Sequence, residues 1–207
     1  MLTIVWDRDD VLNDLMRCWL EQWWKRFHPE CSVRYEQLSE NPPHRILGIS
    51  LEEYLASLDE FRLSEQATEM KPIPEVLAWF KQFGHLYRHI ALSATALDTA
   101  PAAAAWTFRH FGTWIRSFHL VPSARKDQDI PQYDADKGAY LRWLEKGDVL
   151  IDDSPINVEL ARHCGIAGVL VPRPWNPQHG SITDALQRLL TMTGIRDNEI
   201  HSSRQET

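Results

Sequence analysis

The chain has 207 residues, of which 43% are hydrophobic and 25% charged, so it is long enough for one core of ordinary size with a small appended subdomain. Its 22 basic and 29 acidic residues give a formal charge of -7, and no run of Lys or Arg could track a phosphate backbone, which argues against a nucleic-acid polymer as partner. No apolar run approaches the roughly 20 residues that span a bilayer, and Asp7 interrupts any signal-peptide core. We therefore expect a cytoplasmic protein with no membrane partner.

Short apolar runs rich in β-branched residues predict five strands, at 3–6, 89–92, 118–121, 149–151 and 168–171. Stretches with helical spacing lie between them, at 76–83, 101–111, 140–144 and 158–161. Strands that alternate with helices favour parallel pairing. The predicted fold class is therefore α/β, with a doubly wound, mainly parallel five-stranded sheet.

The segment between the first two strands is longer than a simple crossover requires. Its first part, 14–27, places Leu and Trp residues at helical spacing, and further helices are expected from 51 to 69 after a loop. We expect 13–70 to form a helical cap inserted into a core made of 1–12 and 71–195, with 196–207 as a frayed tail. The Trp residues of the cap are expected mainly to pack against one another.

Acidic residues follow two of the predicted strands. Asp7, Asp9 and Asp10 come directly after the first strand, and Asp152 and Asp153 come after the strand 149–151. Ligands of an open parallel sheet bind beyond the carboxyl ends of its strands, and like charges crowded there in a partly dry site repel one another. A bound cation relieves this repulsion best. Carboxylate ligands with room for water and phosphate suit Mg²⁺ rather than Zn²⁺.

Four segments carry a resemblance to a known family, and they stand in its order: "IVWDRDDVL", "IALSAT", the lysine of "DADKGAYL", and "VLIDDSPIN". Through them the chain resembles the haloacid dehalogenase (HAD) superfamily from Leu2 to about Asn176, and the insertion is similar to that superfamily's helical cap of the first type. "DRDDVLNDL", "IDDSPIN" and "RPWN" further resemble the 5′(3′)-deoxyribonucleotidases and their bacterial relatives. The resemblance implies a HAD-like, Rossmannoid core and a Mg²⁺-dependent phosphatase acting on a small molecule.

The resemblance also implies roles for individual carboxylates. Asp7 would attack phosphorus and form an aspartyl-phosphate. Asp9 would protonate the leaving oxygen and later take a proton from water, which requires a raised pKa. The Asp7 side chain, the Asp9 backbone carbonyl and Asp152 would bind the metal, whereas Asp153 would orient Lys137 or a bound water.

Two further positions each have a rival. Ser93 would contact the phosphoryl oxygens, and Thr95 is its alternative because a hydroxyl near a strand end is often only a local cap. Lys137, at the start of a predicted helix, would place a cation on the phosphate and the nucleophile. Lys126 is its alternative because it follows the preceding strand more closely. In the cap, Arg45 is a candidate substrate-binding residue, together with Trp19 and Trp23.

Two hypotheses of function remain. The first is a Mg²⁺-dependent phosphomonoester hydrolase that acts through an aspartyl-phosphate on a small phosphorylated metabolite, with a nucleoside monophosphate as the best guess and a sugar phosphate as its near rival. The second is a non-catalytic scaffold that binds a phosphoryl ligand or a partner. Asp10 favours the second, because the family usually has a small or neutral residue at that position. The sequence indicates no oligomeric state.

Overall fold

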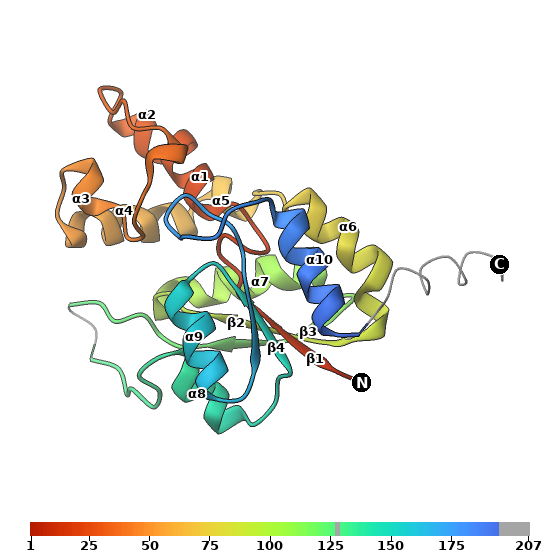
Figure 1. Ribbon diagram of the computed structural model, residues 1–207. Coiled ribbons are helices and arrows are strands. Elements are labelled where there is room, and N and C mark those ends of the chain that lie inside the picture. The colour runs from red at the N-terminus through yellow and green to blue at the C-terminus, as the bar shows by residue number, and fades with distance from the viewer. Residues whose placement is uncertain (127–128, 195–207) are drawn as a thin grey trace.

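The computed structural model describes residues 1–126 and 129–194, so the predicted tail 196–207 lies outside the described residues (Figure 1). Its centre is a five-stranded, all-parallel sheet with the strand order β3-β2-β1-β4-β5. The strands are β1 (Thr3–Trp6), β2 (Arg88–Ser93), β3 (Ile115–Leu120), β4 (Val149–Asp152) and β5 (Ala167–Leu170). The predicted doubly wound α/β fold is confirmed.

Strand β1 lies in the middle of the sheet. Its Val5 is in register with Ile90 of β2 on one side and with Leu150 of β4 on the other. Because successive side chains of a strand point to opposite faces, Ile4 and Trp6 join one apolar cluster and Val5 joins another. Burial on both faces explains the unbroken apolar run in this strand. The acidic loop, residues 7–10, begins where this run ends.

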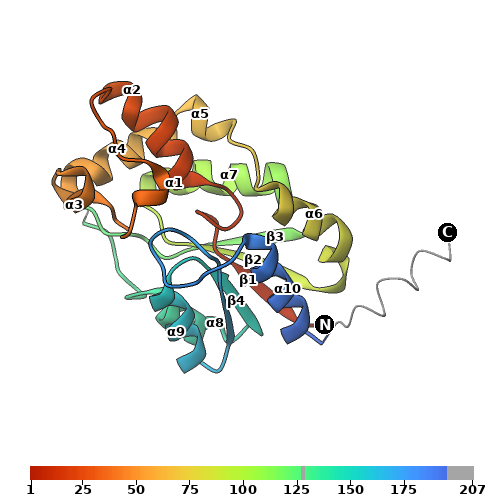
Figure 2. The ribbon, with the colours of Figure 1, turned by 45° about the horizontal axis from the view of Figure 1, so that its top comes forward.

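Helices cover both faces of the sheet (Figures 1 and 2). The face that carries Ile4 and Trp6 packs against α6 (Pro74–Phe83), α7 (Ala100–Phe111) and α10 (Ile182–Met192). The opposite face packs against α8 (Lys137–Leu144) and α9 (Pro155–His163). Two short 3₁₀ turns, η3 (Gly84–Leu86) and η4 (Leu97–Thr99), precede β2 and α7.

Helix α10 is missing from the elements that we predicted. The sequence does hold its signals: the Ser181 hydroxyl accepts the backbone N–H of Asp184 at 3.2 Å, and the Asp184 carboxylate accepts the Ser181 N–H at 2.7 Å. This reciprocal pair is a capping box. Buried side chains then recur at helical spacing, at Ala185, Leu186, Leu189 and Leu190.

The segment between β1 and α6, called the cap below, folds into a group of helices with an apolar cluster of its own. Its elements are α1 (Leu15–Cys18), the π-helical η1 (Trp19–Trp24), α2 (Lys25–Phe27), η2 (Tyr35–Gln37), α3 (His44–Leu47), α4 (Leu51–Leu63) and α5 (Glu65–Thr68). Trp19 and Trp24 are buried in this cluster, with ring centroids 5.5 Å apart. They pack the interior of the cap, as the sequence predicted.

The two connections between cap and core run beside each other and form a neck. Asn13 and Pro72 form an isolated bridge, and the backbone N–H of Ile73 donates to the Leu12 carbonyl at 3.0 Å. The indole of Trp106 on α7 donates to the Met70 carbonyl at 2.7 Å and anchors the neck to the core. The cap therefore leaves the core directly after the acidic loop.

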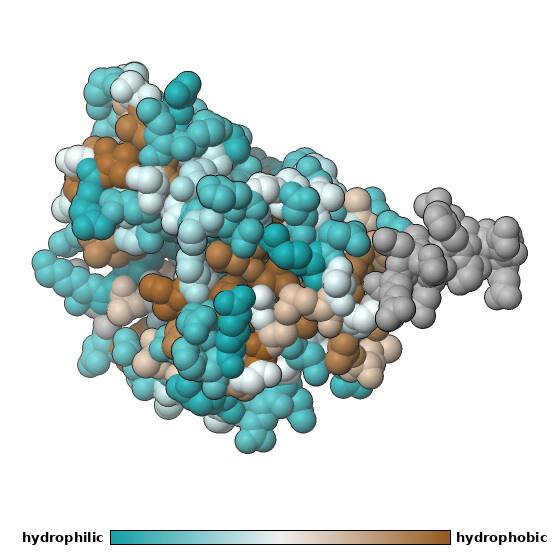
Figure 3. Space-filling view, viewed as in Figure 1, coloured by the Kyte–Doolittle hydropathy of each residue, from teal (hydrophilic) through white to brown (hydrophobic). Residues whose placement is uncertain are grey.

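The face of the molecule in Figure 3 is largely polar, with apolar residues showing over part of the cap and in the middle over the core. Large exposed apolar side chains are spread over several elements and include Phe27, Trp143 and Ile156. Residues of this kind, scattered singly, are normal on a protein surface. Within residues 1–126 and 129–194, no helix combines the length and apolar character that a membrane crossing requires.

Candidate functional site

The first carboxylate of the site is set by the end of β1. Asp7 is 7% exposed, and its backbone N–H continues the sheet by donating to the Ile151 carbonyl at 2.9 Å. Its Oδ1 accepts the N–H of Arg8 at 2.7 Å and the Lys137 ammonium at 2.8 Å. Oδ2 has no hydrogen-bond partner in the described part of the chain. One oxygen of Asp7 is thus held while the other is available.

Lys137 is at the first position of α8, with the helix capped by Asp136, whose side chain accepts the Ala139 N–H at 2.7 Å. Its ammonium group is buried and contacts both Asp7 and Asp152, the latter at 2.7 Å. Burial would lower the pKa of Lys137, but these two carboxylates outweigh it and raise that pKa. Lys137 therefore stays positively charged and stays beside Asp7.

Asp152 is fully buried, and both of its oxygens are engaged. Besides Lys137, they accept the Ser154 N–H at 2.8 Å and the side-chain amide of Asn157 at 3.1 and 3.2 Å. Asp153 instead lines the cavity and does not contact Lys137. The contact with Lys137 that we expected of Asp153 is thus made by Asp152, and Asp153 faces the cavity. The sequence could not separate them, since adjacent residues point to opposite sides at a strand end. Asp152 still belongs to the acidic cluster, so its expected role as a metal ligand stays a prediction.

Asp7, Asp152 and Asp153 each present an oxygen within 4.8 Å of the others. Burial raises the pKa of Asp7 well above its usual range, Lys137 lowers it, and both neighbouring carboxylates raise it. Burial, followed by Asp152, also raises the pKa of Asp153 to about 8. A single ammonium group is too little positive charge to balance these three buried carboxylates. The donor set fits a hard divalent cation such as Mg²⁺.

The pKa of Asp9 differs from the one that we predicted. Its Oδ1 contacts Arg8 at 2.5 Å and its Oδ2 contacts Arg62, from the end of α4, at 2.9 Å. Burial alone would raise the pKa of the Asp9 carboxyl, but the two guanidinium groups outweigh it and hold that pKa below its usual range. The raised pKa that we predicted for Asp9 is therefore wrong for this structure. The larger of the two electrostatic effects that lower it comes from the adjacent Arg8, and the second comes from Arg62, 53 positions away in the cap, which no local sequence pattern indicates.

Asp10 is buried, with a positive φ of 60°, a conformation that Asp and Asn tolerate better than most residues. Its Oδ1 accepts the Met16 N–H at 3.0 Å, and its own N–H donates to the Asn13 side chain at 3.2 Å. Burial raises the pKa of Asp10 well above its usual range. The extra acid therefore shapes the turn between the sheet and the cap.

The two rival hydroxyls differ in their hydrogen bonding. Thr95 Oγ1 pairs with Thr99 Oγ1 at 2.7 Å, so it has a local structural partner. Ser93 is 1% exposed at the end of β2, and its hydroxyl has no hydrogen-bond partner in the described residues. Because a buried unsatisfied hydroxyl is rare and costly, Ser93 is the better candidate for a ligand oxygen.

Four other candidate residues lie away from the site. Lys126 is 75% exposed and 3.5 Å from Glu52, so the geometry favours Lys137 over it. Arg45 is 76% exposed, pairs with Glu40 and does not line the cavity. Trp19 and Trp23 do not line it either. Nothing in the structure supports these three as substrate contacts.

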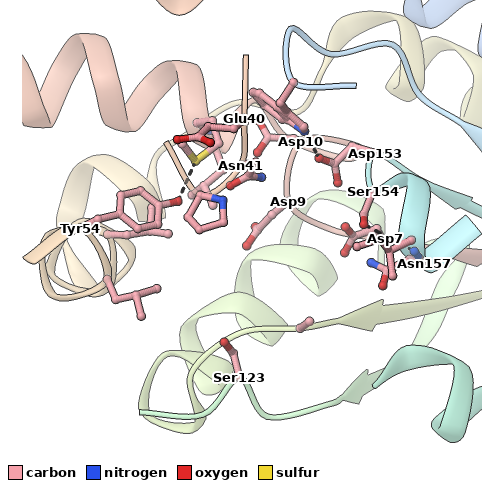
Figure 4. Close-up of a pocket in the computed structure, with 18 of the residues that line it drawn as sticks. Asp7, Asp9, Asp10, Glu40, Asn41, Tyr54, Ser123, Asp153, Ser154 and Asn157 are labelled. Carbon is pink, nitrogen blue, oxygen red and sulfur yellow. Dashed lines mark hydrogen bonds between the residues drawn. The ribbon is translucent and has the colours of Figure 1, made fainter. Parts of the chain in front are cut away.

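A cavity of about 550 Å³ lies between the cap and the carboxyl end of the sheet. In the view of Figure 4, Asp9 lies between Asp7 on the core side and Tyr54 on the cap side. The core contributes Asp7, Asp153 and Lys137 among other residues. The cap contributes Tyr54, five apolar residues and four polar ones: Leu15, Met16, Pro42, Leu55, Leu58, Ser39, Glu40, Asn41 and Arg62. The core side of the cavity is thus charged, and the cap side offers both apolar and polar contacts to an organic group.

Comparison with protein-family models and with curated proteins finds no match. Among solved structures, a haloacid dehalogenase-like hydrolase from Streptococcus pneumoniae matches with a TM-score of 0.57 at 12% identity, over 90% of this chain and 91% of that one. A haloacid dehalogenase-like hydrolase from Bacteroides fragilis matches with a TM-score of 0.57 at 14% identity, over 88% and 92%. A protein assigned as a phosphoglycolate phosphatase from Lactobacillus delbrueckii matches with a TM-score of 0.54 at 14% identity, over 90% of each chain.

The architecture is thus that of the HAD-like, Rossmannoid α/β fold, and the structural neighbours are HAD-superfamily hydrolases. At these identities the likeness shows the fold and leaves the reaction to be argued from the site. The nucleotidase subgroup and the type of the cap remain predictions.

Proposed function

We propose that the protein is a Mg²⁺-dependent phosphomonoester hydrolase that acts through an aspartyl-phosphate on a small phosphorylated metabolite. The observation that carries the proposal is the placement of Asp7. Asp7 lines the cavity, one of its oxygens is bound to Lys137 while the other accepts no hydrogen bond from the described residues, and two more buried carboxylates lie within 4.8 Å. Nucleophile, fixed cation and candidate metal ligands thus meet at one strand end.

In the proposed reaction, Asp7 Oδ2 attacks phosphorus, and the bond between phosphorus and the leaving oxygen breaks. Asp9, which is protonated once Arg62 has moved away from it, delivers that proton to the leaving oxygen. Asp9 then takes a proton from a water that attacks the aspartyl-phosphate, which frees inorganic phosphate and restores Asp7. Lys137 and the Ser93 hydroxyl stabilise the phosphoryl oxygens as charge spreads over them.

Mg²⁺, when bound, would neutralise phosphoryl charge as a Lewis acid. Asp153 would hold it through Oδ1, which accepts no hydrogen bond from another described residue, and Asp7 would contribute Oδ1, the oxygen that does not attack phosphorus. Asp152 would act mainly through Lys137. The predicted ligation by the Asp9 backbone carbonyl stays part of this proposal.

The cavity supports an organic leaving group of moderate size. Its volume of about 550 Å³ has space for a nucleoside monophosphate, and Tyr54 is an aromatic residue of the cap that lines it. The motifs that resemble deoxyribonucleotidases point to the same class. We therefore propose a nucleoside monophosphate as the first substrate to test, with sugar phosphates as the comparison group.

The test is phosphate release from nucleoside monophosphates, sugar phosphates and an aryl phosphate, with Mg²⁺ and with chelator. Asp7→Asn should lower turnover by at least about a thousandfold. Asp14→Asn is the matched control, because Asp14 is in the same connecting segment and pairs with the exposed Arg17. Metal-independent release, or full activity in Asp7→Asn, would refute the proposal.

One observation favours the second hypothesis, a scaffold that binds a phosphoryl ligand without turnover. Both oxygens of Asp9 are paired with guanidinium groups, so this carboxylate is held ionised. A protein that binds a phosphorylated ligand and Mg²⁺ but releases no phosphate from any ester would support the scaffold.

A further inference from the structure

The segment that follows β5 fixes the backbone on two sides of the candidate metal site. Arg173 Nε donates to the Asp10 carbonyl at 2.8 Å. The side-chain amide of Asn176 donates to the carbonyls of Asp153 and Val171, both at 2.8 Å. The "RPWN" motif thus joins the loop after β1 to the loop after β4, and the proposed reaction assigns it no role.

Trp175, between these two residues, contacts the side chain of Asp153. Its indole Nε1 donates to Asp153 Oδ2 at 2.7 Å, the dashed line at Asp153 in Figure 4. The other oxygen, Oδ1, accepts no hydrogen bond from the described residues. A carboxylate can rotate about its last bond unless a fixed donor holds it. The indole thus determines which oxygen of Asp153 is left for a metal.

The ring of Trp175 also packs against the cap. Its centroid is 5.9 Å from that of Tyr35, with the ring planes at 82°, and the ring joins the apolar cluster of the cap. Tyr35 is 3% exposed, and the Arg17 guanidinium lies 3.9 Å from its ring centroid. Tyr35 is thus held firmly within the cap, so one side chain links the cap interior to a carboxylate of the site.

We propose that Trp175 is a positioning residue that ties the Asp153 carboxylate to the cap, so that metal binding and cap closure favour each other. This inference rests on the proposed function, because it requires Mg²⁺ at Asp7 and Asp153. Residues that orient a metal ligand typically change metal affinity by about 10–100-fold. Coupling between two sites is reciprocal, so the bound metal should also stabilise the cap region around Tyr35.

The first test is the Mg²⁺ affinity of the substrate-free protein, measured by isothermal titration calorimetry. Trp175→Phe keeps a ring against Tyr35 but removes the N–H donor, and its affinity should fall by about 10–100-fold. Trp143→Phe is the matched control, because Trp143 is 70% exposed on α8, and its affinity should not change. Equal Mg²⁺ affinity in Trp175→Phe and wild type would overturn the proposal. Absence of Mg²⁺ binding to the wild type would instead count against the proposed function itself.

The decisive arm of the second test uses the wild type alone. Mg²⁺ should slow amide hydrogen exchange in the wild type at residues 33–38 of the cap, and this protection should be lost in Trp175→Phe. Exchange at 33–38 that Mg²⁺ does not change in the wild type would overturn the link to the cap. A merely structural role for Trp175 would lower the unfolding temperature of the variant and leave its Mg²⁺ affinity intact.

Discussion

Replacing Arg62 with glutamine should move the pH range in which the protein works. Arg62 Nη2 lies 2.9 Å from Asp9 Oδ2, and both side chains are at least 86% buried. Unit charges about 4 Å apart interact by about 4 kcal/mol at an effective dielectric constant near 20, which corresponds to about 3 pKa units. Water entering the vacated space offsets part of this. We expect the pKa of Asp9 to rise by about 1–2 units, since Arg8 remains.

The assay is kcat/KM for an alkyl phosphate as a function of pH, which reports the ionisation of the free enzyme. A general acid must carry its proton, so activity falls as pH rises through its pKa. In Arg62→Gln this falling limb should move to higher pH by about 1–2 units. An aryl phosphate should show a smaller shift, because its leaving oxygen needs little help from an acid.

The matched control is Arg109→Gln, because Arg109 is half-exposed and pairs with Glu69 on the surface. Its pH profile should coincide with that of the wild type. A falling limb that does not move in Arg62→Gln, or that moves to lower pH, would show that Asp9 is not the acid or that Arg62 does not control it. Thermal unfolding of both variants verifies that they are folded.

Substitutions at three further positions, two of them with a rival position as control, test the proposed roles of Ser93, Lys137 and Asp153. Ser93→Ala should lower kcat by about a hundredfold without loss of stability, because its hydroxyl has no hydrogen-bond partner among the described residues, whereas Thr95→Val should lower the unfolding temperature and spare turnover. Lys137→Ala should lower kcat/KM by at least about a hundredfold, and Lys126→Ala should not. For Asp153, a folded-state pKa of about 8 means that metal-free stability falls as pH rises from about 4 to about 8. Asp153→Asn should therefore raise the unfolding temperature in chelator above pH 8, by about 2–4 °C per kcal/mol, and should abolish stabilisation by Mg²⁺.

The fold could be predicted because the apolar runs of a parallel sheet are local signals. The strand cores at Thr3–Trp6 and Val149–Ile151 appear as uninterrupted β-rich runs. Lys137 could be placed for the same reason, since it opens a helix with a capping Asp in front of it. Helix α10 has equally local signals, its capping box and its apolar spacing, although we did not predict it.

The rest of the site depends on contacts between distant segments. The pairing of Arg62 with Asp9 joins residues 53 positions apart, and the bond between Trp175 and Asp153 joins residues 22 apart. Which of Asp152 and Asp153 faces the cavity depends on the direction of the chain at the end of β4. These features are set by tertiary packing, which no single segment of sequence encodes.

Two buried ion pairs join the cap to the core, Arg62 with Asp9 and Asp59 with Arg125. Since both oxygens of Asp9 are bound by guanidinium groups, a leaving group reaches Asp9 only after Arg62 gives way. Admission of substrate is then a gated step rather than a simple encounter. Because both pairs are largely buried, salt screens them only weakly, so the rate of this gate should change little with ionic strength.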